Sequence, residues 1–374
     1  MIYIIVITYN GAEDIADFLK TYRECTPPTA HLVVVDNGSA DETLEIVRRE
    51  YPSADILCLP TNTGYAGGAR RGMEYALKRG AEYIAVVNQD IRFTALWLEP
   101  LVDALARNER CAAVQPKILL YPDTTKINSF GNATHYLGFG YTLGYKKTAG
   151  RSELGAKPHV DSQKTTDGRD DMVYPCENGK ELSSFSGAAV LFRSAALKNV
   201  GLIDEFFFMY YEDTDLSWRL RLAGYALLLC CASTVHHRYE FSRSMTKFYY
   251  MERNRLIMLI KNYSVRALFL IAPMGIVMEA GMVAYSACMT VLRRRDSLTL
   301  LEKLRSYLFF LMPRTWIYLH AARREAQKHR RVKDAAIVKL FCDTIEFQDI
   351  DNPLLRYVAN PLMRAYWSVI RIII

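Results

Sequence analysis

Two neighbouring carboxylates, Glu212 and Asp213, are the residues of this sequence best suited to do chemistry. They follow a run of aromatic and apolar residues at 206–211, and a third acid, Asp215, comes two positions later. Acids this close repel one another, and shielding them from water disfavours their charged forms unless something compensates. The pattern therefore favours a general base or a metal ligand at this point of the chain.

The same acids also fit a structural role at the start of a helix. Asp213 or Thr214 could cap a helix that runs to Leu222 and is closed by Gly224. The two interpretations are compatible, because a helix N-terminus stabilises anionic carboxylates and a general base must be anionic. We therefore expect a helix that begins at the acids and keeps the base charged.

The charge of the 374-residue chain is distributed unevenly. The net charge is +7, but residues 241–374 carry 22 Lys and Arg against 10 Asp and Glu, whereas residues 1–240 carry 25 against 30. The composition is that of a globular protein and excludes a disordered one. We expect two functional regions, 1–240 and 241–374, of which the second faces something anionic.

The cysteines and the N-terminus predict a cytoplasmic protein. No pair among the eight cysteines has C-x-x-C spacing, so neither a zinc site nor a disulfide framework is indicated, and we expect reduced thiols. The apolar run 1–7 is too short for the hydrophobic region of a signal peptide.

The first 90 residues alternate between strand-like and helix-like patterns. Short apolar runs rich in β-branched residues are typical of parallel strands buried on both faces, and helices between them predict an α/β sheet with right-handed crossovers. The motif at 39–42 (Ser-Ala-Asp-Glu) predicts a capping box. The expected strands are 2–7, 32–35, 56–59 and 83–87, and the expected helices are 12–22, 41–49 and 67–78.

Polar residues follow three of these strands. They are Thr8-Tyr9-Asn10, Asp36-Asn37-Gly38-Ser39 and Asn88-Gln89-Asp90. Ligands of open α/β sheets bind outside the carboxyl ends of the strands, so three polar strand ends predict one nucleotide site. The glycine-rich segment 62–68 precedes the third helix, but it is neither a dinucleotide-binding fingerprint nor a P-loop, which disfavours dehydrogenases and P-loop NTPases.

Taken together, these segments resemble the inverting GT-A glycosyltransferases of family 2, especially the rhamnosyltransferase-like branch. The resemblance covers residues 1–264. It implies a GT-A fold, a mostly parallel sheet flanked by helices, with a donor half at about 1–120 and an acceptor half at about 121–240. The matching motifs are Val6-Ile-Thr-Tyr-Asn10, Val34-Val-Asp-Asn-Gly-Ser-Ala-Asp41, Asn62-Thr-Gly-Tyr-Ala-Gly-Gly68, Asn88-Gln-Asp90, Phe185-Ser-Gly-Ala-Ala189, Gly201-Leu-Ile-Asp-Glu205 and Phe208–Arg219.

The resemblance also implies where a nucleoside-diphosphate-sugar would bind. Thr8, Tyr9 and Asp36 would surround the nucleobase and ribose, with Asp36 accepting a hydrogen bond from the pyrimidine N3–H. The family commonly has paired asparagines after the glycine loop, whereas here Arg70 and Arg71 follow and could contact the diphosphate. The expected nucleotide-binding residues are Thr8, Tyr9, Asn10, Asp36, Asn37, Gly38, Gly64, Arg70, Asn88 and Gln89.

The metal and the base follow from the same resemblance. Asp90 would bind Mg²⁺ or Mn²⁺, with His237 completing the site and His236 as the competing choice. Asp213 would be the catalytic base, with Glu212 and Asp215 setting its position and charge. The reaction would transfer one sugar, with L-rhamnose suggested, to a glycan or polyprenyl-linked acceptor, since the Q-x-x-R-W element of processive synthases is absent.

Two other functions remain open at this stage. A nucleotidyltransferase shares the general α/β layout, although no glycine-rich, lysine-bearing signature opens the chain. The second alternative is a non-catalytic subunit of a membrane complex that binds nucleotide-sugar or serves as a scaffold. Nothing indicates nucleic-acid binding, and the oligomeric state is not predicted. The polar segment 148–181 is expected to be a long loop that covers the donor as a lid.

The last third of the chain predicts contact with a membrane. Residues 267–292 hold no charged residue except Glu279 and are long enough to span a bilayer. The basic runs 293–295 and 323–333 follow it, which opposes a single span by the positive-inside rule. An interfacial helix or a hairpin at the inner face of the cell membrane fits better, with the apolar stretch 307–312 packed against it. The alternative is a helix bundle with a solvated basic face.

Overall fold

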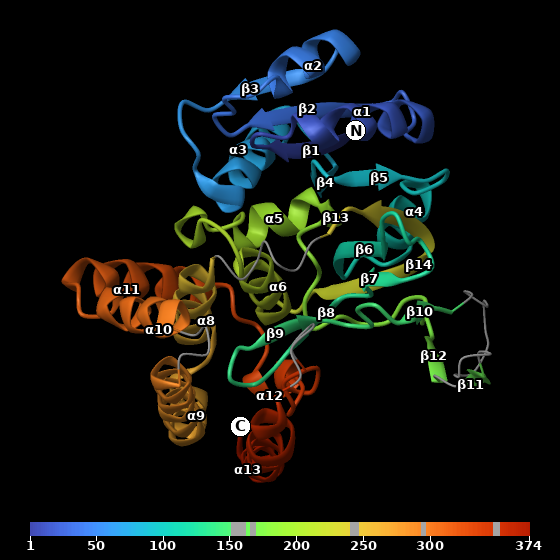
Figure 1. The fold of residues 1–374 in the computed structure, drawn as a ribbon. Helices are drawn as coiled ribbons and strands as arrows, with labels where there is room; N and C mark the ends of the chain where they lie inside the picture. Colours follow the sequence, from blue (N-terminus) through green and yellow to red (C-terminus); the bar gives the residue numbers. More distant parts are fainter. Residues whose placement is uncertain (151–161, 165–169, 240–246, 293–296, 347–351) are drawn as a thin grey trace.

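The structure is a computed structural model that describes residues 1–150, 162–164, 170–239, 247–292, 297–346 and 352–374. Its main element is a nine-stranded sheet in the order β3-β2-β1-β4-β13-β6-β14-β5, with β7 beside β6 (Figure 1). The strands are β1 Ile2–Thr8, β2 Ala30–Asp36, β3 Asp55–Cys58, β4 Tyr83–Asn88, β5 Ile91–Phe93, β6 Cys111–Leu120, β7 Ile127–Ser129, β13 Ala189–Arg193 and β14 Ala226–His237.

The first four strands pair in parallel, as predicted, and the rest make the sheet mixed. β1 lies between β2 and β4, with Thr8 opposite Asp36 and Ile7 opposite Asn88. β13 is antiparallel to both β4 and β6, and β14 is parallel to β6. The carboxyl ends of β1, β2, β4, β6 and β14 therefore lie at one edge of the sheet.

Both faces of the sheet are buried, which explains the continuous apolar runs of its strands. Along β1, Ile4 and Val6 belong to one core, whereas Tyr3, Ile5 and Ile7 belong to the other. Helices α1, α2 and α4 contribute to the first core and α3, α5 and α6 to the second. These helices are α1 Ala12–Cys25, α2 Thr43–Glu50, α3 Gly64–Lys78, α4 Glu99–Arg107, α5 Ser194–Val200 and α6 Glu212–Leu222.

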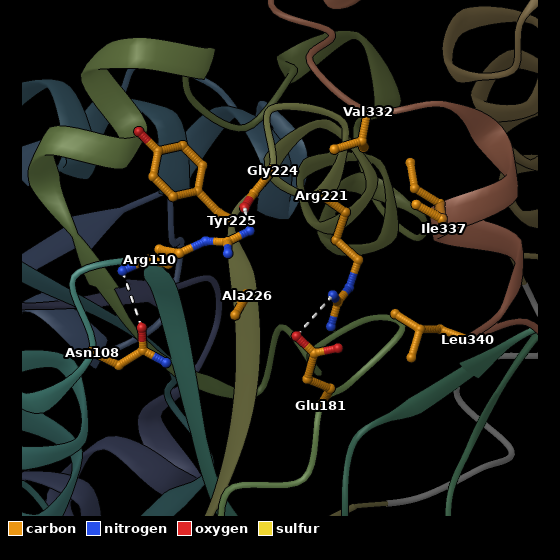
Figure 2. A pocket seen from close by; sticks show the side chains of 11 residues that line it. Asn108, Arg110, Glu181, Arg221, Gly224, Tyr225, Ala226, Val332, Ile337 and Leu340 are labelled. Atoms are coloured by element: carbon orange, nitrogen blue, oxygen red, sulfur yellow. Dashed lines mark hydrogen bonds and ion pairs between the residues drawn. The ribbon is translucent and has the colours of Figure 1, made fainter.

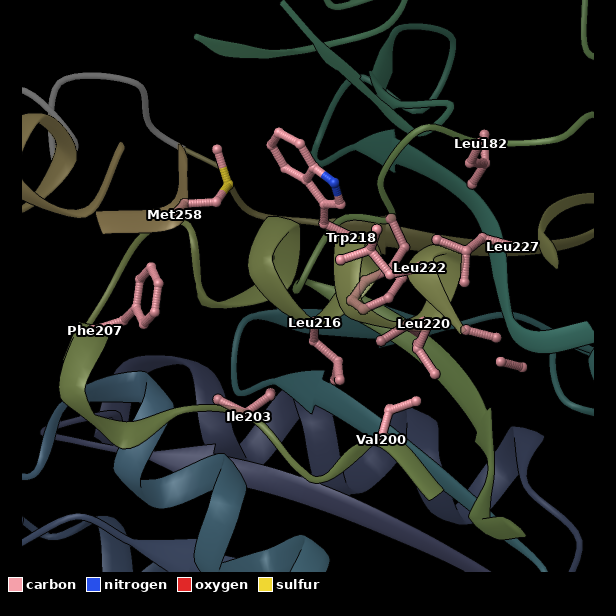
Figure 3. Packing of buried hydrophobic residues seen from close by; sticks show 14 of the residues in the cluster. Leu182, Val200, Ile203, Phe207, Leu216, Trp218, Leu220, Leu222, Leu227 and Met258 are labelled. Atoms are coloured by element: carbon pink, nitrogen blue, oxygen red, sulfur yellow. The ribbon is translucent and has the colours of Figure 1, made fainter. Parts of the chain in front are cut away.

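Helix α6 is buried on nearly every side. Ten of its eleven residues are buried, and Asp213 is the half-buried exception. Figure 3 shows its apolar side chains packed against other buried residues, among them Met258 of α8 (Phe248–Asn262). A helix surrounded in this way has its position fixed by packing on all faces.

The C-terminal helices continue the second core instead of forming a separate one. Trp218 of α6 makes edge contacts with Tyr263 and Phe341, and Met363 and Trp367 of α13 belong to the same core. In Figure 1 these helices lie below and beside α6, on the opposite side of the molecule from the N-terminus. They are α8 Phe248–Asn262, α9 Val265–Val291, α10 Ser297–Phe309, α11 Pro313–Lys328, α12 Asp334–Val338 and α13 Asn360–Ile373, with the short turns η1 Glu205–Phe207 and η2 Leu355–Ala359.

The predicted caps of two helices are wrong, although α6 does begin at the acids as expected. The residue before α2 is Glu42, and no side-chain cap is formed there, so the capping box is absent. Asp41 instead accepts hydrogen bonds from the N–H groups of Thr43 and Ala12. The residue before α6 is Tyr211, so Asp213 lies inside the first turn and does not cap the helix. Gly224 does close α6, with φ of 88°.

Part of the predicted loop at 148–181 is a small sheet. β10 Thr148–Ala149 pairs with β12 Asp170–Tyr174, which also pairs with β11 Ser162–Lys164. Residues 151–161 and 165–169 lie outside the described residues, so the lid stays a prediction. A second hairpin, β8 Asn132–Thr134 with β9 Gly140–Thr142, lies nearby in the sequence.

The expectation of reduced thiols is wrong for one pair of cysteines. A disulfide joins Cys176 to Cys231, whose Cα atoms are 5.9 Å apart although 55 residues separate them in sequence. The spacing of cysteines along the chain cannot reveal such a pair, because β14 brings Cys231 beside the segment after β12.

Candidate active site

The ends of β1 and β2 form one hydrogen-bonded unit. The Thr8 hydroxyl lies 3.3 Å from Asp36 Oδ1, and Asp36 Oδ2 accepts from the Ser39 N–H at 3.1 Å. Asn10 and Ser39 join the loops that follow, since Ser39 Oγ accepts from the Asn10 N–H. Tyr9 donates its N–H to Gln89 Oε1, which ties in the loop after β4. The three predicted strand ends therefore meet at one place.

Asn37 connects this unit to the glycine loop. Its Nδ2 donates to the Gly64 carbonyl at 2.8 Å, and its Oδ1 accepts from the N–H and hydroxyl of Thr63. Gly38 and Gly64 have φ of 79° and 73°, which L-residues with a side chain rarely adopt. The turn before α3 is thereby held against the strand ends.

Asp90 and His237 are brought together across the sheet. β14 ends at His237 beside β5, and His237 Nε2 lies 3.0 Å from Asp90 Oδ1. His237 Nδ1 lies 2.9 Å from Asn128 Oδ1, an arrangement that fits a proton on Nδ1 and leaves Nε2 for a metal ion. Both atoms are of the kinds that bind divalent cations, and their separation suits two neighbouring ligands of one metal ion as well as a shared proton.

The described residues offer few further protein ligands. They hold no cluster of three or more His, Cys, Asp or Glu that could bind a metal. Mg²⁺ and Mn²⁺ sites that use one or two protein ligands complete their shell with water and substrate phosphates. His236, the competing choice, pairs with Arg92 in the register between β14 and β5, and its neighbour His237 is the one that contacts Asp90.

Asp213 and Glu212 have opposite environments although they are neighbours. Asp213 Oδ2 accepts from the Gly187 N–H at 3.0 Å, and Oδ1 accepts from the N–H and hydroxyl of Thr214 at 2.6 and 3.1 Å. Glu212 is buried, and its Oε2 has no hydrogen-bond partner among the described residues. Hydrogen-bond donors and a helix N-terminus stabilise an anion, so the negative charge of the pair belongs on Asp213.

The pKa values agree with this division. Burial raises the pKa of Glu212 well above its ordinary value, and the charge of Asp213 raises it further. Burial also raises the pKa of Asp213, but the hydrogen bonds from Gly187 and Thr214 oppose that rise. Glu212 is therefore the carboxyl that keeps its proton, and Asp213 is the one able to act as a base.

A short chain of contacts joins Asp213 to the Asp90–His237 pair. Gly187, which donates to Asp213, is followed by Ala188, whose carbonyl accepts from the Asn88 N–H at 3.0 Å. Asn88 Nδ2 in turn lies 3.5 Å from His237 Nε2. The candidate base and the candidate metal ligands thus belong to one continuous site.

Two predicted site residues are directed elsewhere. Asp215 is fully buried and accepts hydrogen bonds from Arg219 of its own helix and from Lys261 and Asn262 of α8, but none from the residues around Asp213. Arg70 pairs with Glu74 at 2.9 Å on its own helix.

Three contributors had no predicted role. Tyr65 donates its hydroxyl to the Gly187 carbonyl at 2.5 Å, and burial together with the neighbouring carboxyl groups raises its pKa. Gly187 lies within the quoted motif at 185–189, which was the available signal. Asn128, which orients His237, lies outside every motif, and the sequence held no signal for it.

A cavity of about 280 Å³ lies at the opposite edge of the sheet (Figure 2). It is formed where β6 and β14 begin and α6 ends, and Arg221 lies across from Glu181 at 3.8 Å. None of the predicted site residues lines it. This cavity is therefore separate from the site at the carboxyl ends of the strands.

The chain is similar to known glycosyltransferases. Residues 3–159 match the family described as Glycosyl transferase family 2. N-acetylglucosaminyl-diphospho-decaprenol L-rhamnosyltransferase of Mycobacterium tuberculosis is 27% identical over 251 residues, which cover 63% of this chain and 75% of that protein. The dTDP-rhamnosyl transferase RfbF of Shigella flexneri is 25% identical over 275 residues, covering 70% of this chain and 81% of that protein.

A solved structure is similar in fold. The crystal structure of GalNAc-T7 with UDP, GalNAc and Mn²⁺ superposes with a TM-score of 0.54 at 14% identity. The match covers 74% of this chain and 51% of that one, so the chain spans about half the length of this neighbour. At this identity the likeness concerns the fold alone.

Proposed function

We propose that the chain, a glycosyltransferase with the GT-A fold whose residues 3–159 match glycosyl transferase family 2, transfers a single sugar with inversion of configuration. The donor is a nucleoside-diphosphate-sugar and the acceptor is a lipid-linked glycan. L-rhamnose from a dTDP donor is the proposed sugar, because two of the relatives are named as rhamnosyltransferases. The observation that carries the proposal is the continuous site that joins Asp213, through Gly187 and Asn88, to His237 and Asp90.

In this proposal Asp213 removes the proton of the acceptor hydroxyl. Its carboxylate is anionic because Gly187 and Thr214 donate hydrogen bonds to it, while Glu212 carries a proton. The hydroxyl oxygen attacks the anomeric carbon from the face opposite the leaving nucleoside diphosphate. General-base assistance of this kind is worth about 10²–10⁴-fold in rate.

The strand ends hold the donor. Asp36, with Thr8 beside it, would accept a hydrogen bond from the nucleobase. Asp90 and His237 would hold Mg²⁺ or Mn²⁺, and such a cation, when bound, offsets the charge of the leaving diphosphate. Asn128 keeps the Nε2 atom of His237 available to a metal.

The C-terminal helices are proposed to rest on an anionic membrane surface at the cytoplasmic side. Of the 24 large hydrophobic side chains that are exposed among the described residues, 20 lie between Val265 and Ile373. Helix α9 is long and apolar enough to cross a bilayer, and no other helix of the described residues is. Exposed apolar patches of this extent mark protein or membrane contacts.

The internal contacts favour an interfacial position for α9. Its one acid, Glu279, pairs with Lys303 of α10 and Arg255 of α8, so this part of α9 is bound to neighbouring helices. In the basic run, Arg330 pairs with Asp334, and Arg323 donates to main-chain carbonyls of α8 and the residue after it. Arg324, Arg331 and Lys333 remain exposed and could attract anionic lipid, but the run 293–295 lies outside the described residues.

A donor screen tests the catalytic proposal. The full-length chain is incubated with dTDP-L-rhamnose, UDP-galactofuranose or UDP-N-acetylglucosamine, with a polyprenyl-diphosphate-linked N-acetylglucosamine acceptor in detergent. We expect nucleoside diphosphate release that requires Mg²⁺ or Mn²⁺ and stops with EDTA. Release of pyrophosphate would indicate a nucleotidyltransferase instead, and no release from any donor would contradict the proposal.

Vesicle flotation tests the membrane proposal. Wild-type protein should float with vesicles containing anionic lipid. Ile276→Glu and Ile372→Glu, which change side chains 69% and 82% exposed on α9 and α13, should weaken flotation. Leu96→Glu is the matched control, because Leu96 is 67% exposed in the donor half. Equal flotation of all variants would contradict this surface, and a wild type that stays in solution would favour a solvated helix bundle.

A further inference from the structure

The segment that leads into the candidate base has an unusual backbone. Phe208, Tyr210 and Tyr211 have φ of 64°, 65° and 70°, and Tyr211 is the residue from which α6 begins. Aromatic residues rarely adopt these angles, because the Cβ atom crowds the backbone. Three such residues in four positions persist only where the surroundings impose them, and strain of this kind gathers at functional sites.

Helix α8 supplies the groups that impose this conformation. Asn254 is fully buried, and its Nδ2 lies 2.8 Å from each of three carbonyl oxygens, those of Phe207, Met209 and Tyr210. Beside it, Arg253 Nη2 donates to the Phe206 carbonyl at 3.0 Å and to that of Phe207 at 2.9 Å. Arg253 Nε also donates to Asn254 Oδ1, which fixes the direction in which the amide N–H groups of Asn254 point.

The two carbonyls that α8 does not contact are engaged on the side of the active site. The Phe208 carbonyl accepts from the Ala66 N–H at 3.0 Å, in the first turn of α3, and the Tyr211 carbonyl accepts from the Asp215 N–H at 2.8 Å. Every carbonyl oxygen from 206 to 211 thus has a defined partner. A Cβ on Gly64 would lie 2.1 Å from the Phe208 oxygen, so the turn also lies directly against the glycine loop.

We propose that Asn254, with Arg253, is a positioning residue that aims the Asp213 carboxylate by holding the left-handed turn at 207–211. The inference rests on the proposed role of Asp213 as the base. Asp213 is the second residue of α6, so the turn sets both the starting point and the direction of its side chain. Within this turn Asn254 contacts main-chain carbonyls and no side chains. It therefore acts on the reaction indirectly, by holding the backbone that carries Asp213.

The isosteric variant Asn254→Asp tests the proposal. It keeps the shape of the side chain and the acceptor for Arg253, but it replaces the N–H donors with an oxygen that faces three carbonyl oxygens. We expect kcat for nucleoside diphosphate release to fall about 100-fold, the effect of misplacing a reacting group by about 1 Å. The Kd for dTDP should change less than about threefold, since the strand ends that bind the nucleotide are unchanged. The acid limb of the kcat–pH profile should move to higher pH, because Asp213 loses hydrogen bonds that oppose the rise of its pKa.

Gln327→Glu is the matched control. Gln327 of α11 also uses a side-chain amide to donate to two main-chain carbonyls, those of Lys261 and Asn262, at the far end of α8. The same change from amide to carboxylate should lower the melting temperature there, with kcat within about twofold of wild type. Equal kcat losses in both variants at equal destabilisation would mean that Asn254 is merely structural and would overturn the proposal.

Arg253→Lys is the second variant, for use if Asn254→Asp does not fold. It keeps the charge but cannot donate to both carbonyls from one planar group, so we expect a smaller fall in kcat with the same unchanged Kd. An unchanged kcat in a folded variant overturns the positioning role. The proposed function fails separately, when wild type releases no nucleoside diphosphate or when Asp213→Asn keeps near-normal turnover, and this inference then fails with it.

Discussion

Replacing Glu212 by glutamine distinguishes the two neighbouring carboxyls at the start of α6. Glu212→Gln keeps the shape and hydrogen-bonding capacity of a protonated glutamate. If Glu212 already carries a proton, the variant reproduces the working state of the enzyme, and Asp213 remains the only anionic member of the pair. We therefore expect kcat to stay within about threefold of wild type, since no group that acts in the reaction is lost.

The variant should also be more stable than wild type near neutral pH. Burial and the charge of Asp213 raise the pKa of Glu212 above its unfolded value, so folding becomes less favourable as pH rises from the unfolded pKa toward the folded one. Each pH unit over which only the folded state holds the proton is worth about 1.4 kcal/mol, and an unfolded glutamate titrates near ~4.3. The gain from glutamine can therefore reach about 4 kcal/mol at pH 7 and no more. It should fall to a few tenths of a kcal/mol at about pH 4, where both states are mostly protonated.

Urea unfolding at pH 4, 5, 6 and 7 measures this gain directly, and donor turnover over the same range measures the catalytic effect. The acid limb of kcat should stay in place in Glu212→Gln, because Glu212 is already neutral where Asp213 titrates. Loss of more than about 100-fold in kcat would identify Glu212 as the base and refute the assignment to Asp213. A gain in stability that is the same at pH 4 and pH 7 would refute the argument from proton binding.

Three further predictions concern the site and its support. Asp213→Asn should lower kcat by about 10²–10⁴-fold while calorimetry shows unchanged dTDP binding. Weakened or lost dTDP binding would instead mean that Asp213 acts in the donor pocket. Asp90→Asn should weaken Mn²⁺ binding in the presence of dTDP by more than about tenfold, as followed by the free-Mn²⁺ paramagnetic resonance signal, whereas an unchanged signal would exclude Asp90 as a ligand. Lys303→Met should lower the free energy of unfolding by about 3 kcal/mol, because Glu252 and Glu279 lose a buried cation, and a loss below about 1 kcal/mol would show that Arg255 alone neutralises them.

Much of the donor half could be predicted because its signals are local. The runs at β1, β2 and β4 are buried on both faces, and each polar residue that follows, such as Thr8 or Asp36, lies at the strand end by its position alone. The parallel order of these strands then brings the ends together without further information. Even the contact between Asp90 and His237 follows once β5 and β14 are neighbours.

Two features of the site could not be predicted: the direction in which side chains of α6 point, and contacts between residues far apart in the sequence. Residues two apart on a helix point about 200° apart, so Asp213 and Asp215 cannot face the same site once both lie inside α6, and Asp215 turns to Lys261 instead. The sequence could not show that the helix begins one residue before Asp213, because the left-handed Tyr211 that starts it is imposed by Asn254, 43 positions further on. Such long-range contacts leave no local pattern.

The buried contacts of α8 have a practical consequence for shortening this protein. The boundary proposed between 240 and 241 lies outside the described residues, and a chain cut there would retain every residue predicted to touch donor, metal or acceptor. It would nevertheless lose Asn254 from the turn before the base and Lys261 from Asp215. A soluble fragment that ends at 240 would thus keep the inventory of the active site without its alignment, and the shortest useful truncation retains α8 to its end at Asn262.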